Sequence, residues 1–282
     1  MNYLYFWQGH RNFGDELSLY LVNKITEKNF SPANPPFNKT TISAIGSIIT
    51  TKSLSKNLII WGSGTLKEDV LKPTPLRLFP ISRFTKGLKE NFFREHPDIR
   101  AVRGPRTKQL LDNIGVKCPT IFGDPAILTP LFYTPRQIQN PYKVGLILHQ
   151  SQTNPLNQSQ AESIGIRIIS IERESPKEIE AFIDEVCSCD LIFSSSLHGI
   201  IIAQAYKIPA QWIQLPEQPI EDHNYHKFED YFLGAGQTLQ HPLAIDFTNE
   251  SLTLLKKNRP PKILPFSRAK ELYSAFPFDA VE

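Results

Sequence analysis

The sequence has few cysteines, little net charge and no long apolar run. Only three of the 282 residues are cysteines, namely Cys118, Cys187 and Cys189. So small and odd a number does not indicate a disulfide framework, and it favours a reducing compartment. No segment reaches the ~18 uninterrupted apolar residues that a membrane-spanning helix needs. The first residues also lack the basic and apolar regions of a signal peptide. These absences predict a cytoplasmic protein.

The charge of the chain is nearly balanced, and its composition is that of a globular protein. The 31 Lys and Arg residues and 28 Asp and Glu residues give a net charge of +3, whereas nucleic-acid binders concentrate basic residues on one face. We therefore expect no nucleic-acid partner. Hydrophobic residues make up 40% of the chain and charged residues 21%, which excludes disorder. The length predicts two domains.

Short apolar runs alternate with amphipathic segments, which predicts strands alternating with helices. The runs predicted to be strands are 3–7, 58–61, 99–102, 144–149, 166–171, 191–194 and 210–214. The segments predicted to be helices are 15–25, 105–113, 176–187, 199–206 and 267–276. This alternation predicts an α/β fold with two Rossmann-like parallel sheets that face a cleft. A proline-rich stretch, 130–141, divides the chain into domains 1–135 and 136–282.

Glycine occurs with polar or charged side chains in four segments that follow predicted strands. These segments are 12–15, 62–65, 102–107 and 194–199. Ligands of open α/β sheets bind outside the carboxyl ends of the strands. Glycine lets a ligand approach the backbone, and a helix N-terminus offers N–H groups to an anion. The sequence therefore predicts a site for an anionic ligand at these segments.

The order and spacing of these segments resemble the polysaccharide pyruvyl transferase family. The matching residues are Asn12, Gly14 and Asp15, the Gly62-Ser63-Gly64 turn, Arg103, and the runs 123–126, 195–199 and 227–231. The resemblance implies a two-domain fold like that of GT-B glycosyltransferases, with helix 267–276 packed back on the first domain. It also implies transfer of a pyruvyl group from phosphoenolpyruvate to two hydroxyls of a sugar unit. The products are a cyclic ketal, in an exopolysaccharide, capsule or cell-surface glycan, and phosphate.

This chemistry predicts a role for each matching residue. Protonating the enol carbon needs a general acid, and His198 is the candidate because histidine ordinarily titrates near a pKa of about 6.5. Arg103 can bind phosphate or carboxylate through two parallel hydrogen bonds. Asp15 is the candidate acceptor-side carboxylate. The other donor-side candidates are Arg106, Ser195, Ser196 and Lys227, and the other acceptor-side or cleft candidates are Asn12, Gly14, Gly62, Ser63, Gly64 and Asp124. Phosphoenolpyruvate is a co-substrate, and we expect no metal and no cofactor.

One position departs from the family pattern. Many members carry an arginine two residues before the motif histidine, whereas this chain carries Ser196. The change removes one cation from the expected phosphate contacts. Lys227 is the candidate that replaces it.

Each candidate also has a purely structural interpretation. His198 could be a core or capping histidine, and Arg103 could pair with a surface carboxylate. Asp15 and Asp124 are of the residue type that caps helices and starts turns, and Lys227 could be a solvated surface lysine. The sequence leaves these alternatives open.

Other segments bear on the partners of the protein. Residues 83–94 interleave basic and aromatic side chains, which predicts either contact with an anionic membrane or lipid diphosphate carrier, or an amphipathic helix packed on the core. The saccharide acceptor is accordingly either free or lipid-linked, and the protein either free or peripheral at the inner face of the membrane. The basic run 256–259 is typical of a solvated helix end. His223 and His226 lack the third ligand of a zinc site.

Two other functions fit the same pattern. One is a GT-B-type glycosyltransferase that uses a sugar nucleotide bound in the second domain. The other is a non-catalytic carbohydrate-binding or scaffold protein, an interpretation that Ser196 favours. Release of phosphate from phosphoenolpyruvate distinguishes the pyruvyl transferase from both.

Overall fold

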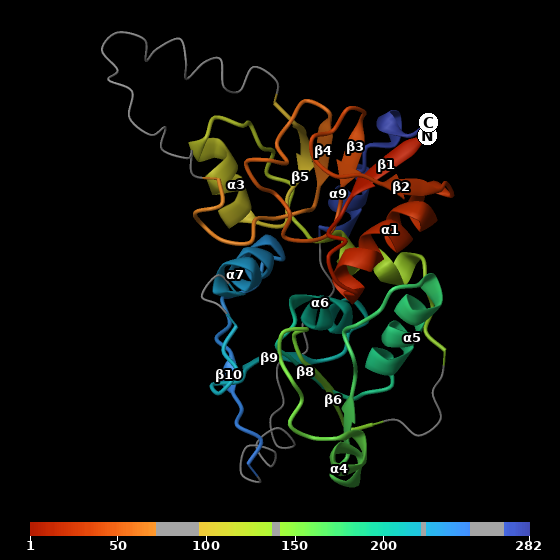
Figure 1. The fold of residues 1–282 in the computed structure, drawn as a ribbon, viewed down its shortest axis with the longest axis vertical. Coiled ribbons are helices and arrows are strands. Elements are labelled where there is room, and N and C mark those ends of the chain that lie inside the picture. The colour runs from red at the N-terminus through yellow and green to blue at the C-terminus, as the bar shows by residue number, and fades with distance from the viewer. Residues whose placement is uncertain (72–95, 137–141, 221–223, 249–267) are drawn as a thin grey trace, which may run out of the picture.

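The fold contains two five-stranded parallel sheets with helices between and around them (Figure 1). The computed structural model describes residues 1–71, 96–136, 142–220, 224–248 and 268–282. The predicted α/β class with two parallel sheets is confirmed. The basic segments 83–94 and 256–259 lie outside the described residues.

The two sheets have the same strand order. The first runs β2-β1-β3-β4-β5, and the second runs β10-β9-β8-β6-β7. The strands of the first are β1 (Asn2–Tyr5), β2 (Phe30–Pro32), β3 (Thr41–Ser43), β4 (Leu58–Trp61) and β5 (Asp98–Ala101). Those of the second are β6 (Val144–Ile147), β7 (Ile166–Ile168), β8 (Ile192–Ser194), β9 (Ala210–Gln214) and β10 (Leu243–Ala244). Counted along the chain, each order is 2-1-3-4-5, which reverses direction between its first and third strands, the place where doubly wound sheets bind ligands.

Capping residues account for where several helices begin. Asn12 caps α1 (Phe13–Thr26) by accepting a hydrogen bond from the Gly14 amide. Ser175 and Glu178 form the predicted capping box of α5 (Pro176–Cys187). The other helices are α3 (Pro105–Asn113), α4 (Gln158–Ser163), α6 (Leu197–Ala205), α7 (Asn224–Gly234) and α9 (Ala269–Ser274), with 3-10 helices η1 (Pro125–Leu131) and η2 (Phe278–Ala280). Local sequence therefore specifies the starts of α1 and α5.

The two halves share one buried apolar cluster. Phe13 of α1 stacks on Phe182 of α5 with ring centroids 4.0 Å apart, and the Phe13 amide donates to the Ile171 carbonyl at 2.8 Å. The Tyr206 hydroxyl donates to the Tyr133 carbonyl at 2.9 Å. Buried side chains from both sheets belong to the same cluster. The halves are therefore joined by packed side chains as well as by the chain itself.

The C-terminal segment lies against the first sheet. The Trp61 indole N–H donates to the Leu272 carbonyl at 2.8 Å, and its ring meets Phe276 edge-on at 4.8 Å. Both chain ends lie at this sheet (Figure 1). The chain crosses to the second sheet between η1 and β6. The domain division at residue 135 stays a prediction.

The structure also differs from the predicted elements. Helix α6 begins at Leu197 instead of residue 199, which puts His198 in its first turn. Strands β2, β3 and β10 and helices α4 and α7 were not predicted. These strands have only two or three residues, too few to show a period of two. The neighbouring strands decide their conformation.

Candidate active site

Two loops at the reversal points of the strand order carry a carboxylate and an imidazole. Asp15 lies in the first turn of α1, after β1, and His198 lies in the first turn of α6, after β8. The predicted ligand site is thus expected at the carboxyl ends of β1 and β8. Burial raises the pKa of Asp15, and an electrostatic interaction with His198 opposes that rise. The structure therefore brings these two candidates together.

His198 lies directly over the backbone of Gly14. A Cβ atom on Gly14 would overlap the imidazole, so only glycine at this position leaves room for the ring. The His198 side chain is 14% exposed. Gly14 therefore makes space for the imidazole, whereas the sequence predicts that this glycine makes space for a ligand.

The other face of His198 meets a carboxylate. His198 Nε2 and Asp124 Oδ2 are 3.8 Å apart, and the Asp124 side chain is only 1% exposed. Neither atom has a hydrogen-bond partner within the described residues. Asp124 Oδ1 accepts from the Ala126 amide at 3.0 Å and so caps η1. Buried polar atoms are rarely left unpaired, so this pair is a place where a proton or a ligand atom can be accommodated.

Arg103 follows β5 and is buried. Its side chain is 1% exposed. Nε donates to Asp230 Oδ2 at 3.1 Å, Nη1 to Ser47 Oγ at 2.5 Å, and Nη2 to the Thr65 carbonyl at 2.7 Å. A Cβ atom on Gly64 would overlap the guanidinium. Arg103 thus pairs with a carboxylate, but with the buried Asp230 and not with the surface carboxylate of the structural interpretation.

Lys227 of α7 links Arg103 to Asp15 electrostatically. Burial and, to a smaller extent, the charge of Arg103 lower the pKa of Lys227, Asp15 opposes this shift, and the resulting pKa is about 8. Burial raises the pKa of Asp15 to about 6, while His198 and Lys227 oppose that rise. The four side chains of Asp15, His198, Lys227 and Arg103 therefore form one electrostatic cluster, which we call the charged cluster.

The remaining candidates have structural partners. Arg106 pairs with Glu229 at 2.5 Å and with Glu68 at 3.5 Å, at the surface. Ser195 Oγ donates to Gln152 Oε1 at 2.6 Å and accepts from the His149 amide at 2.9 Å. Ser196 is the N-cap residue of α6, without a capping hydrogen bond from its side chain. These contacts neither require nor exclude a role in ligand binding.

The Gly62-Ser63-Gly64 turn packs inside the first half. Gly62 has φ +94°, and a Cβ there would overlap Pro125. Ser63 Oγ and Ser43 Oγ are 2.6 Å apart and buried. Asn12 caps α1, and its Nδ2 donates to Gln150 Oε1 at 2.8 Å. These residues thus shape the backbone around the charged cluster.

Five residues near Arg103 were given no role there by the sequence, although four of them lie in segments or pairs that it singles out. They are Ser47, Thr65, Thr107, His226 and Asp230. Asp230 lies in the run 227–231, but without a predicted role. His226 accepts or donates one hydrogen bond, to Thr65 Oγ1 at 2.8 Å. His223 lies outside the described residues.

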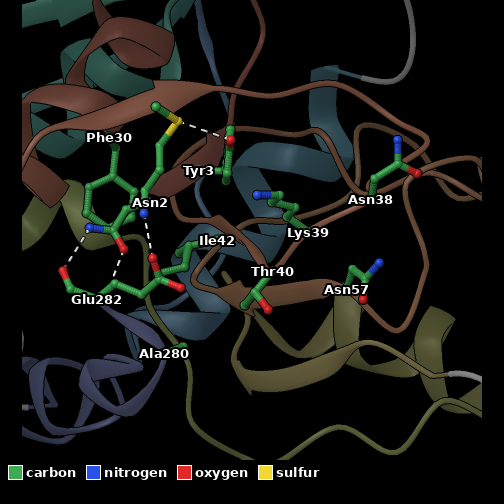
Figure 2. A pocket seen from close by; sticks show the side chains of 11 residues that line it. Asn2, Tyr3, Phe30, Asn38, Lys39, Thr40, Ile42, Asn57, Ala280 and Glu282 are labelled. Atoms are coloured by element: carbon green, nitrogen blue, oxygen red, sulfur yellow. Dashed lines mark hydrogen bonds and ion pairs between the residues drawn. The ribbon is translucent and has the colours of Figure 1, made fainter.

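A cavity of about 330 Å³ lies at the opposite edge of the first sheet (Figure 2). Asn2, Thr40 and Asn57 line it near the amino ends of β1, β3 and β4. The charged cluster follows the carboxyl ends of strands, so this cavity is separate from it. Among the described residues, no three His, Cys, Asp or Glu side chains are grouped to bind a metal ion. No described helix is long and apolar enough to cross a bilayer.

Residues 12–213 match the model of the polysaccharide pyruvyl transferase family. The chain belongs to this family. The resemblance inferred from the sequence motifs is thereby confirmed, and the family implies a saccharide acceptor. The match covers Asp15, Arg103, Asp124 and His198 and ends before α7, which carries Lys227 and Asp230.

Two relatives extend the comparison. The mimivirus protein L143, from Acanthamoeba polyphaga mimivirus and itself uncharacterised, is 25% identical over 91% of this chain and 80% of its own length. The succinoglycan biosynthesis protein ExoV of Rhizobium meliloti is 28% identical over 73% of this chain. The aligned region spans 57% of ExoV. A functionally uncharacterised Klebsiella pneumoniae structure is 12% identical, with a TM-score of 0.45 and coverage of 82% of this chain and 87% of that one. Family and ExoV together support a transferase in polysaccharide modification.

Asp15→Asn is expected to remove part of the pH dependence of stability. A carboxyl whose pKa is about 6 in the folded state and 3.8 as a model value binds more protons folded than unfolded between these values. The wild-type free energy of unfolding therefore falls as the pH rises through this interval, by about 2 kcal/mol from this group. Urea unfolding at about pH 4.5 and about pH 7 measures the fall in both proteins.

Asp112→Asn is the matched control, because Asp112 is an exposed aspartate of α3 that pairs with Lys108. The fall should be smaller in Asp15→Asn than in the wild type and unchanged in the control. The same fall in all three proteins would show that Asp15 ionises without a burial penalty.

Proposed function

We propose that this family member transfers a pyruvyl group from phosphoenolpyruvate to two hydroxyls of one saccharide unit, leaving a cyclic ketal. The observation that carries the proposal is the pair of His198 Nε2 and Asp124 Oδ2, buried, 3.8 Å apart and without a hydrogen-bond partner in the described part of the chain. Asp15 lies close enough to interact electrostatically with the same imidazole. A general acid beside carboxylates is what addition to an enol requires.

The donor is an anion, and the charged cluster offers two cations to it. Arg103 keeps one N–H on each terminal nitrogen beyond its contacts with described residues, which suits bidentate binding of a carboxylate or phosphate. The lowered pKa of Lys227, about 8, would rise beside a bound anion because a negative charge favours the ammonium form. We assign to Lys227 the charge that Ser196 cannot supply.

The reaction starts with proton transfer from His198 to the CH2 carbon of the enol phosphate. The neighbouring carbon becomes oxocarbenium-like, and one sugar hydroxyl adds to it, forming a C–O bond and losing its proton to Asp15. The second hydroxyl then replaces phosphate at the same carbon as the C–O bond to phosphate breaks. The proton that Asp15 took from the first hydroxyl passes to His198 and restores both groups, and the proton of the second hydroxyl leaves with phosphate. Asp124 faces Nε2 and is placed to orient the imidazole throughout.

Asp15 suits the acceptor side of this reaction. A carboxylate with a pKa of about 6 accepts a proton more readily than an ordinary aspartate and is still ionised at neutral pH. The proposal includes a GT-B-like cleft between the two sheets, with the acceptor entering from the side of α1. It also includes a cytoplasmic location, where the free thiols of Cys118, Cys187 and Cys189 stay reduced. The acceptor in it is either free or lipid-linked at the inner membrane face.

One assay tests the proposal. The protein is incubated with phosphoenolpyruvate and oligosaccharides, with succinoglycan fragments included because of the similarity to ExoV. We expect phosphate release together with a saccharide that gains the mass of one pyruvic acid less one water. Phosphoenolpyruvate should also raise the melting temperature.

The two rival functions predict different results in the same assay. A glycosyltransferase would be stabilised by uridine diphosphate sugars and would release no phosphate from phosphoenolpyruvate. A carbohydrate-binding or scaffold protein would bind glycan with no phosphate release. Either pattern would refute the proposed reaction.

A further inference from the structure

Helix α7 connects the second sheet to the guanidinium of Arg103. On one side, Phe228 stacks on Trp212 of β9 with ring centroids 4.2 Å apart and planes 6° apart. On the other side, Asp230 lies against Arg103 and Thr107. Figure 1 shows α7 beside α3, below the first sheet. The helix therefore contacts both halves of the molecule.

Asp230 is completely buried and makes three hydrogen bonds. Oδ2 accepts from Arg103 Nε at 3.1 Å and from Thr107 Oγ1 at 2.7 Å, and Oδ1 accepts from the Thr107 amide at 3.0 Å. The exposed fractions of the Arg103 and Asp230 side chains are 1% and 0%. A buried ion pair contributes little net stability after desolvation. Its effect here is to fix the direction of one guanidinium edge.

Close backbone contacts keep α7 in place against Arg103. A Cβ atom on Gly104 would overlap the Asp230 carbonyl, and one on Gly234 would overlap the Arg103 carbonyl. Only glycine allows this approach at both positions. The carboxylate of Asp230 is thus held at a constant distance from β5.

A chain of hydrogen bonds continues from Asp230 to His226. Thr107 Oγ1 donates its only proton to Asp230 and accepts from the Thr65 amide at 3.0 Å. Thr65 Oγ1 lies 3.2 Å from Thr107 Oγ1 and 2.8 Å from His226 Nε2, so its one proton can go to either atom. Thr65 thus joins His226 to the Thr107 hydroxyl that holds the Asp230 carboxylate.

The contacts of Arg103 leave a defined pair of donors. Three of its five N–H groups bond to Asp230, Ser47 and the Thr65 carbonyl. Among the described residues, the two N–H groups that remain are one on each terminal nitrogen. Removing the Nε contact would leave the planar group held only through its two terminal nitrogens. The two remaining donors would then be less firmly oriented.

We propose that Asp230 is a positioning residue, which with Thr107, Thr65 and His226 holds the Arg103 guanidinium in the orientation that binds the anionic donor. This inference rests on the proposed function, since the donor is phosphoenolpyruvate. It assigns no contact with substrate to Asp230. It also explains why a helix outside the family match carries a buried aspartate.

Asp230→Asn tests the inference, because asparagine keeps the size and removes the charge. We expect the KM for phosphoenolpyruvate to rise about tenfold or more, the loss typical of a hydrogen bond to a charged group. The KM for the saccharide should stay unchanged. A residue that served folding alone would lower the active fraction, and so kcat, without moving one KM selectively.

A second pair of variants covers the case in which Asp230→Asn does not fold. Thr107→Val keeps the volume and removes the hydroxyl, and we expect it to raise the KM for phosphoenolpyruvate about fivefold. Thr107→Ser keeps the hydroxyl and should restore the wild-type value. Asp112→Asn, an exposed aspartate of the same helix α3, is the control and should leave both KM values unchanged.

The Nε–H signal of Arg103 in an NMR spectrum gives a readout independent of turnover. It is assigned with Arg103→Lys and should shift in Asp230→Asn and Thr107→Val but not in Thr107→Ser or Asp112→Asn. An unchanged KM for phosphoenolpyruvate in folded Asp230→Asn, or in Thr107→Val, would overturn the inference while wild-type turnover keeps the proposed function intact. If the wild type releases no phosphate, the proposed function is refuted instead. In that case the NMR spectra still test the positioning contact, and an unshifted Arg103 Nε–H signal in Asp230→Asn would refute it.

Discussion

Replacing His198 with alanine is expected to lower kcat by about a hundredfold or more, the range for a lost general acid. The imidazole lies between Gly14 and Asp124, and no other described histidine interacts with Asp15 in the same way. The substitution removes a mostly buried ring, so the folded fraction is measured by circular dichroism on the same samples. Phosphate release from phosphoenolpyruvate in the presence of acceptor gives kcat.

Two further variants show whether the position of the ring matters. Gly14→Ala should also lower kcat strongly, because its methyl group would occupy the place of the imidazole. His241→Ala removes an exposed histidine and should leave kcat unchanged. Near-normal kcat in folded His198→Ala would exclude His198 as the acid and leave Asp124 or Asp15 for that role.

Replacing Arg103 with alanine is expected to lower both turnover and stability. Loss of a charge clamp on the donor should reduce kcat/KM for phosphoenolpyruvate by about a hundredfold or more. The Asp230 carboxylate would remain buried and uncompensated, which lowers the free energy of unfolding by about 3–5 kcal/mol. Urea unfolding and initial rates measure the two losses separately.

A double variant separates the two effects. Arg103→Leu combined with Asp230→Asn removes both charges and should recover much of the stability, while turnover stays low. Arg100→Ala is the matched control, because Arg100 lies on β5, shortly before Arg103, and pairs with Asp98 and Asp279 at the surface. Its expected loss of stability is below about 1 kcal/mol. Full turnover in the stable double variant would show that Arg103 has only a structural role.

Local patterns were sufficient for much of the secondary structure. The box of Ser175 and Glu178 correctly predicts the start of α5, and Pro105 correctly predicts that of α3. Both signals act within one helical turn, so they survive in any tertiary context. The three-residue strands β2 and β3 have no such signal, because pairing with β1 determines them.

The candidate site likewise has a part that local sequence predicts and a part that it does not. Asp15 and His198 were predicted together because each follows a strand in a parallel α/β fold, and the structure brings them together. The pairing of His198 Nε2 with Asp124 Oδ2, neither of which has a hydrogen-bond partner among the described residues, was not predictable. It depends on the packing of side chains that are 74 residues apart in the chain.

Sequence alone was enough to predict the α/β class, the starts of α3 and α5 and the family, because periodicity, capping residues and ordered motifs are properties of neighbouring residues. The burial of Arg103 against Asp230 and the space that Gly14 leaves for His198 became visible only in the folded chain. Both facts depend on close contacts between segments more than 100 residues apart. A contact of that kind is selected by the packing of the whole chain, so no local pattern records it.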